Sequence, residues 1–333
     1  MARAQFISGG RFLVHVGEDG STEIVEVASG LHRSALPART NVHVRGRENV
    51  AIAEDAVAIL DREGAVHRGD LTSGEWQRAL TAPAYGRIRR ARLAIRGPMV
   101  AVSYERQFDY KADNAHLLFR NDRKLIEIPL GTWIEVLDLR ITADRIECIL
   151  VSHGEVHARF VSFDYEGCAR EEMPVIPPVG EVHAARFFGR SEFVVVSGGG
   201  EGAYVSLHSL AHMRGHLIYR CAQEATRFER TFDVRRTPDG RLQLAVFSGG
   251  KVELLTIEGG ATIARESMAA DCVYRAALAQ DSEEIYLDAI VKSDSDIREL
   301  ADRRAMCVVP NSEAAKNEPM APSSYFPPRR SYR

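Results

Sequence analysis

The sequence predicts an all-β protein made of seven similar units of about 45 residues, each with three or four short strands. An apolar residue followed by serine recurs along the middle of the chain, at Val102-Ser103, Val151-Ser152, Val196-Ser197 and Phe247-Ser248. Turns containing glycine, aspartate or asparagine separate alternating apolar segments at regular intervals. No long amphipathic helical pattern interrupts them. These three observations indicate repeated β-hairpins along a single chain.

The segment 247–260, FSGGKVELLTIEGG, is one copy of the repeated hairpin. Sliding the segment 145–167 along the chain by 96 residues places Val151-Ser152 on Phe247-Ser248 and Val156 on Val252. Each hairpin is therefore expected to supply the two middle strands of a four-stranded unit. The second strands of the seven units are expected to begin near Arg11, Val50, Met99, Arg145, Glu192, Arg241 and Glu284.

Small four-stranded units cannot bury both of their faces alone, so units of this length stack around an axis. The sequence thus predicts a single β-propeller of seven blades over residues 1–311, with the ring closed by N- and C-terminal strands, the first of them near Ala4–Ser8. A pair of β-sandwiches is the alternative. Seven similar units and the lack of a composition break near the midpoint disfavour it.

The segment 232–259, FDVRRTPDGRLQLAVFSGGKVELLTIEG, resembles a blade of the tryptophan-aspartate-repeat and quinoprotein-like propellers, in which a PDG turn joins an inner strand to two following strands. The other units resemble such blades more loosely. No unit ends in the Trp-Asp dipeptide, and Trp76 and Trp133 are not periodic. The resemblance implies a β-propeller fold and a function in binding other proteins. It assigns a functional role to no residue of this chain.

The composition, with 45% hydrophobic and 27% charged residues, is that of a soluble globular protein. A net charge of −3 disfavours nucleic acid or an anionic membrane as a partner held by bulk charge. The five cysteines are widely spaced without a Cys-x-x-Cys pair, which indicates reduced thiols rather than disulfides or a zinc site. The N-terminus has no signal-peptide pattern, and no apolar run is long enough to span a bilayer. These features predict a cytoplasmic protein.

Arginines recur on the predicted innermost strands, and they could form a basic ring at the axial channel that holds phosphate or carboxylate. The ring would comprise Arg92, Arg140, Arg186, Arg235 and Arg275. The other interpretation is that they pair with acids such as Asp138, Asp233 and Glu135, or face solvent. The second interpretation is the preferred one.

Two segments are candidate partner-binding elements because exposed aromatic and arginine side chains commonly dominate interfaces. The first is a long loop, Ser103–His116, with Tyr104, Phe108 and Tyr110. The second is the proline-containing tail, residues 312–333, which ends in SYFPPRRSYR and includes Tyr325, Phe326, Arg329 and Arg330. The segment 173–180, MPVIPPVG, is expected to be a stiff connector between blades.

No catalytic motif is present: the chain has neither a Gly-x-Ser-x-Gly nor a Walker-type phosphate loop. His208, His212 and His216 are spaced as on a helix, but they fall where strands and a turn are expected, so no metal site and no cofactor are predicted. The sequence favours a non-catalytic interaction platform within a multi-protein assembly. An enzyme or anionic-ligand binder using the arginines, and a structural subunit of a large particle, remain as alternatives. The oligomeric state is not predicted.

Overall fold

The computed structural model contains 26 strands and no helix in the residues it describes. None of these residues forms a helix long and apolar enough to cross a membrane. The structure describes residues 2–7, 12–16, 22–26, 32–36, 50–53, 56–61, 63–81, 87–107, 114–120, 124–199, 202–221, 232–237, 239–248, 251–259, 261–269, 273–278 and 285–291. The predicted all-β class is confirmed.

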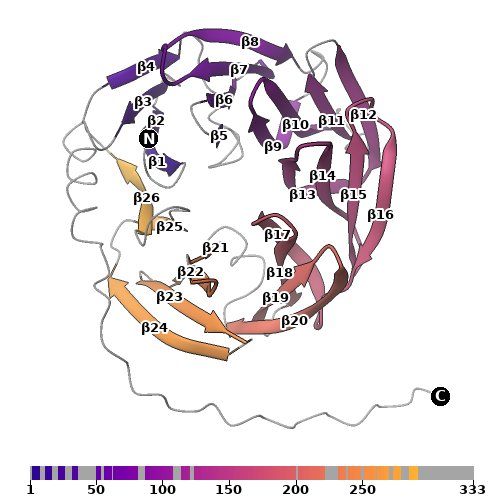
Figure 1. The fold of residues 1–333 in the computed structure, drawn as a ribbon, viewed down its shortest axis with the longest axis vertical. Coiled ribbons are helices and arrows are strands. Elements are labelled where there is room, and N and C mark those ends of the chain that lie inside the picture. The colour runs from indigo at the N-terminus through magenta and orange to yellow at the C-terminus, as the bar shows by residue number, and fades with distance from the viewer. Residues whose placement is uncertain are drawn as a thin grey trace.

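Five antiparallel sheets of four strands each follow one another around a central opening (Figure 1). They are β5 (Val50–Ala53), β6 (Ala56–Leu60), β7 (Ala65–Asp70) and β8 (Trp76–Thr81); β9 (Arg87–Arg96), β10 (Met99–Gln107), β11 (Asn114–Arg120) and β12 (Leu125–Thr132); β13 (Ile134–Ile141), β14 (Arg145–Ser152), β15 (Ala158–Asp164) and β16 (Ala169–Val175); β17 (Glu181–Phe188), β18 (Glu192–Gly199), β19 (Gly202–Ser209) and β20 (His212–Cys221); β21 (Phe232–Arg236), β22 (Leu242–Ser248), β23 (Lys251–Glu258) and β24 (Ala261–Ala269).

A sixth sheet joins the two ends of the described chain. Its six strands run in the order β25 (Val273–Leu278), β26 (Ile285–Val291), β1 (Ala2–Ile7), β2 (Phe12–Val16), β3 (Thr22–Glu26) and β4 (His32–Leu36). Strand β1 pairs antiparallel with β26, with Ala4 opposite Ala289. The first and last sequence units therefore share one sheet among the described residues.

The hairpin period locates most second strands correctly. Strands β10, β14 and β18 begin at the expected Met99, Arg145 and Glu192, and β22 begins at Leu242, one residue from the expected start. Val50 is the exception, because it begins the first strand of its sheet and the second begins at Ala56. The charged dipeptide Glu54-Asp55 separates these two short apolar strands in the sequence, and the hairpin period alone missed it.

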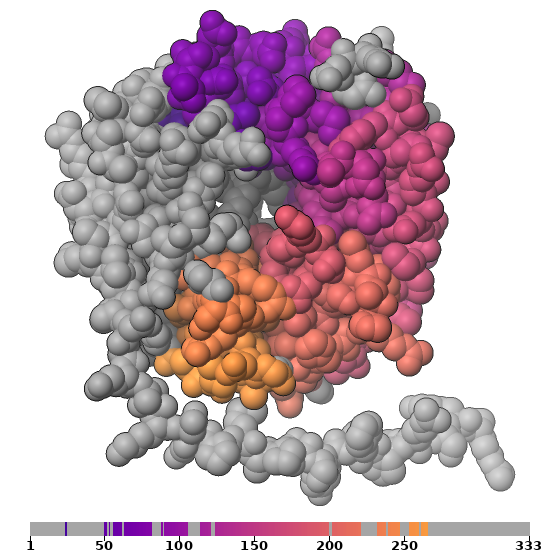
Figure 2. All heavy atoms as spheres, viewed as in Figure 1, coloured from indigo at the N-terminus to yellow at the C-terminus, as the bar shows by residue number. Residues whose placement is uncertain are grey.

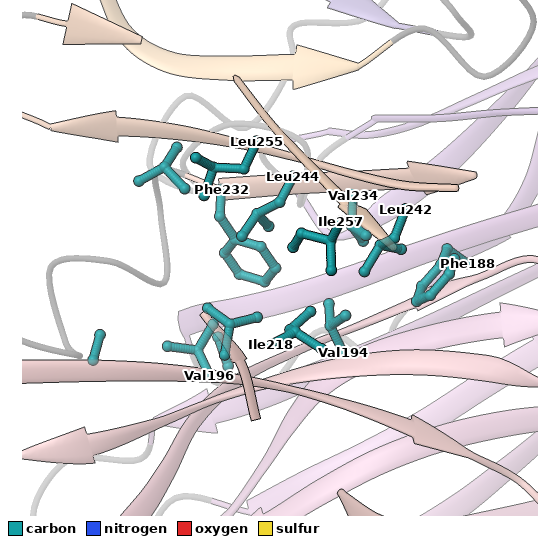
Figure 3. Packing of buried hydrophobic residues seen from close by; sticks show 14 residues of the cluster. Phe188, Val194, Val196, Ile218, Phe232, Val234, Leu242, Leu244, Leu255 and Ile257 are labelled. Carbon is teal, nitrogen blue, oxygen red and sulfur yellow. The ribbon is translucent and has the colours of Figure 1, made fainter. Parts of the chain in front are cut away.

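The core lies between neighbouring sheets. Figure 3 shows the layer between the β17–β20 and β21–β24 sheets, where side chains from both meet. Val194, Val196, Phe232, Leu244 and Leu255 are each at most 1% exposed. Because each such side chain contributes about 1.5–3 kcal/mol when it is fully buried, these contacts hold the two neighbouring sheets together. The sheets thus form a preorganised support for the loops at their ends.

Candidate interaction face

The arginines of the predicted ring lie on edge strands that face the centre of the disc. They are Arg92 on β9, Arg140 on β13, Arg186 on β17, Arg235 on β21 and Arg275 on β25. Figure 1 places these strands nearest the axis, and the space-filling view in Figure 2 shows a hollow there. The side chain of Arg275 lies outside the described residues.

Two of these arginines donate hydrogen bonds to the backbone of the next sheet. Arg92 Nε donates to the carbonyl of Leu137 at 2.8 Å. Arg140 donates to the carbonyls of Gly189 at 3.1 Å and Arg190 at 3.0 Å. The donor and acceptor are 45 to 50 residues apart, which matches the repeat spacing. These guanidinium groups therefore join the β9–β12 sheet to the β13–β16 sheet, and the β13–β16 sheet to the β17–β20 sheet.

The next two arginines are engaged differently. Arg186 forms an ion pair with Asp233 on the following sheet at 2.7 Å and lies 5.3 Å from the centre of the Phe232 ring. Arg235 is 2% exposed and donates from Nε to Oε1 of Gln243 in its own hairpin at 2.7 Å. Asp233 is one of the acids that the preferred sequence interpretation named as partners for these arginines.

Asp138 on β13 lies between the arginines of the two neighbouring sheets. Its Oδ2 accepts a hydrogen bond from the backbone N–H of Phe187 at 2.6 Å. Burial raises the pKa of this carboxyl above its usual value, and the charges of Arg186 and Arg92 oppose that rise. Arg92, Asp138 and Arg186 thus form an alternating row of charges near the axis. A ligand held by the arginines would have to compete with these contacts, and the ligand ring stays a prediction.

The aromatic loop is shorter than expected. Strand β10 extends to Gln107 and β11 begins at Asn114, so residues 108–113, with Phe108 and Tyr110, lie outside the described residues. Tyr104 is a strand residue that is 2% exposed, and its ring stacks on His116 at 5.4 Å. The expectation that Tyr104 belongs to a loop is therefore wrong, because the alternating pattern of β10 continues through it.

The tail also lies outside the described residues, with Tyr325, Phe326, Arg329 and Arg330. His208 lies on β19, and His212 and His216 lie on β20, so the strand interpretation of this segment is confirmed. Within the described part of the chain, no three histidine, cysteine or acidic side chains are grouped so that they could hold a metal ion.

Three exposed apolar side chains that sequence reasoning missed lie on connections at one end of the β13–β16 sheet. They are Trp133, Val156 and Val179, and we call them together the Trp133 patch; their exposed fractions are 56%, 46% and 39%. Trp133 precedes β13, Val156 lies in the turn between β14 and β15, and Val179 lies between β16 and β17. Because neighbouring strands run in opposite directions, the start of β13, the turn between β14 and β15 and the end of β16 all lie at the same end of the sheet.

Backbone hydrogen bonds hold the three connections of the patch together. The N–H of His153 donates to the carbonyl of Trp133 at 2.7 Å, and the N–H of Val182 donates to the carbonyl of Val156 at 3.3 Å. At Gly180, where φ is +68°, an added Cβ would lie 2.7 Å from the Cα of Gly198, so the Val179 connection packs directly on the end of β18. The patch is therefore fixed to two adjacent sheets.

The backbone of Trp133 is itself unusual. Its φ of +59° makes it the one described residue other than glycine in the left-handed region. That conformation costs about 1–2 kcal/mol for a residue with a Cβ. The indole ring stacks on His153 at 5.8 Å, yet it remains largely exposed. A strained backbone that presents a large aromatic side chain to solvent points to a contact role rather than a packing role.

The comparisons bear on the fold. No protein-family model matches the chain, and no curated protein matches it. Among solved structures, the Cps50 (Swd1) β-propeller domain of Myceliophteria thermophila has a TM-score of 0.58 at 10% identity, covering 85% of this chain and 92% of that chain. U3-55K has a TM-score of 0.55 at 12% identity, covering 85% and 86%. Hsv2 of Kluyveromyces lactis has a TM-score of 0.54 at 11% identity, covering 85% and 88%.

At sequence identities this low, the matched structures show the fold of the chain and nothing more specific. The resemblance of residues 232–259 to a propeller blade is confirmed at the level of the whole chain, since the matched structures cover most of it. The chain has a β-propeller fold, and no specific family is assigned.

Proposed function

We propose that the chain is a non-catalytic protein-interaction platform, a scaffold or adaptor subunit of a multi-protein assembly in the cytoplasm. The observation that carries the proposal is the Trp133 patch, where hydrogen-bonded connections of two adjacent sheets present an exposed tryptophan and two exposed valines. Tryptophan is prominent among the residues that dominate binding energy at interfaces. A preformed backbone also lowers the entropy lost when a partner binds.

The remaining sequence candidates belong to the same proposal. Phe108 and Tyr110 follow the last residue of β10, Gln107, in the sequence. We assign them, with Tyr325, Phe326, Arg329 and Arg330 of the tail, to partner contact. Tyr104 is left out because its ring is buried. A structural subunit of a large particle would use the same surface, and only the identity of its partner would distinguish it.

Affinity capture from the native host tests the proposal. We expect the full chain to retain a stoichiometric partner that Trp133→Ala loses, because truncation of an interface hot spot costs at least about 2 kcal/mol. Leu125→Ala is the matched control, since Leu125 is 52% exposed and begins β12 at the opposite edge of the disc. A chain that emerges alone and monomeric, or a partner equally retained by both variants, would contradict the platform.

We further infer that the ring has seven blades and is closed by pairing of its N- and C-terminal strands. The pairing of β1 with β26, which joins residues 2–4 to residues 289–291, supports this inference. Removing residues 1–8 should then lower the thermal unfolding midpoint by several degrees, because an open ring exposes blade faces and edges. Removing residues 312–333 is the control and should change the midpoint little. Equal midpoints for the two truncations would count against closure.

A further inference from the structure

The three connections that form the Trp133 patch, residues 131–135, 152–157 and 176–182, contain Glu135, Glu155 and Glu181 and neither lysine nor arginine. Arginines contact them from neighbouring strands: Arg90 pairs with Glu135, Arg159 lies 3.4 Å from the Ser152 hydroxyl, and Arg214 forms a β-bridge with Ile176. Glu135 is already paired, since its Oε2 lies 2.5 Å from Nη1 of Arg90. Glu155 and Glu181 are exposed and form no ion pair with any other residue that the structure describes. Two carboxylates therefore remain for a partner's cation.

The exposed indole suits the same kind of group. One side of the Trp133 ring packs on His153, and more than half of the residue is open to solvent. Tryptophan is the best aromatic acceptor for a cation placed over its ring. A guanidinium can stack flat on an indole and still direct its N–H groups at a carboxylate, whereas an ammonium group offers only a compact charge.

We propose that the Trp133 patch binds an extended, arginine-containing segment of a partner protein. An arginine of that segment stacks on Trp133 and donates to Glu155 or Glu181, while an apolar neighbour in the segment contacts Val156 and Val179. The carboxylates repel phosphate groups, so the patch selects against nucleic acid and acidic peptides. This inference rests on the proposed platform function and names the chemistry of its partner.

Peptide binding to the full-length protein tests the chemistry directly. The probe is fluorescein-labelled Pro-Val-Arg-Pro-Val-Arg-Pro, followed by fluorescence anisotropy. The matched peptide with citrulline at both arginine positions keeps the planar shape and loses the charge, and we expect it to bind about tenfold more weakly. A lysine peptide should fall between the two. Equal affinity of the arginine and citrulline peptides would overturn the proposal.

Protein variants locate the binding site. Trp133→Ala and the double variant Glu155→Gln, Glu181→Gln should each weaken the arginine peptide about tenfold, while Leu125→Ala should leave it unchanged. Trp133→Gly provides a check on folding, because glycine accepts the positive φ and its unfolding midpoint should be no lower than that of the parent. Peptide binding that survives both tryptophan substitutions would overturn the proposal.

The chain's own tail is the other arginine-bearing candidate. If it were the occupant, replacing Arg329, Arg330 and Arg333 with glutamine would strengthen peptide binding by freeing the patch, and the partner assignment would be wrong. Failure of this inference can be told from failure of the proposed function. Suppose that a captured partner depends on Trp133 but the arginine and citrulline peptides bind equally well. The platform function would then be supported, and only the proposed recognition of arginine would be wrong.

Discussion

Replacing Glu147 with glutamine is expected to lower the free energy of unfolding by about 3 kcal/mol, because it breaks a buried pair and leaves charge uncompensated. Glu147 lies on β14 and its side chain is 1% exposed. One carboxylate oxygen lies 2.5 Å from Nε of Arg140, and the other lies 2.8 Å from Nε of Arg145. The substitution keeps the shape of the side chain but removes the charge that both guanidinium groups share.

The effect should reach the neighbouring sheet through Arg140. Its guanidinium lies over the ring of Phe187 at 4.2 Å and donates to two carbonyls of the turn between β17 and β18. Glu147 fixes the arginine in that position. Its loss should therefore weaken a tie between blades as well as a pair within one sheet.

A nearby acid provides a matched control. Glu171 pairs with the same Arg145 at 2.8 Å, but its side chain is 47% exposed. Since exposed ion pairs contribute about 0–1 kcal/mol, Glu171→Gln should change stability by less than that. Urea denaturation of both variants measures the difference. A Glu147→Gln variant no less stable than Glu171→Gln would show that the buried pair adds nothing beyond its desolvation cost.

The repeat was predictable because it depends on local sequence. An apolar strand, a serine and a turn recur with little variation, so the starts of β10, β14 and β18 follow from the pattern alone. The placement of arginines on edge strands is equally local. Their partners are not, because the acceptors of Arg92 and Arg140 come from the next blade, and the register between blades is a tertiary property.

The Trp133 patch could be predicted only in part, for a related reason. In the segment 125–136, LIEIPLGTWIEV, the alternation places Trp133 on the same face as Glu127 and Glu135, which indicates exposure. Nothing in that segment shows that Val156 and Val179 lie at the same end of the sheet. The break between β12 and β13 falls at Trp133, whose φ is positive and whose side chain is exposed. The glycine and threonine before it are the only local signal of a connection, and they are weak.

Acidification is expected to destabilise the fold through His208, and replacing this histidine should flatten the dependence of stability on pH. His208 is 2% exposed, stacks on Phe193 at 5.0 Å and lies close to Gly215, where a Cβ would come within 2.2 Å of the imidazole. Nδ1 lies 3.0 Å from the carbonyl of Met213, so that nitrogen carries the proton and Nε2 accepts from Ser206 at 2.9 Å.

Burial lowers the pKa of His208 from 6.5 to about 4, because the charged imidazolium would lose its hydration. Between those values the unfolded chain binds the proton and the folded chain does not. Above pH 6.5 the histidine is neutral in both states and costs the folded chain nothing. As the pH falls from 6.5 towards 4, the free energy of unfolding decreases, by about 3 kcal/mol in total.

Urea unfolding at a series of pH values between 4 and 7 measures this slope. His208→Asn retains an amide donor for the Met213 carbonyl but cannot titrate, so the variant should be less stable at neutral pH and should lose less stability on acidification. His212→Asn is the control, because His212 is exposed at the start of β20 and its replacement should leave the slope unchanged. If the free energy of unfolding falls with pH equally in the parent and in His208→Asn, protonation of His208 is not what destabilises the fold in acid. Protonation of the carboxylates that join the blades would then be responsible.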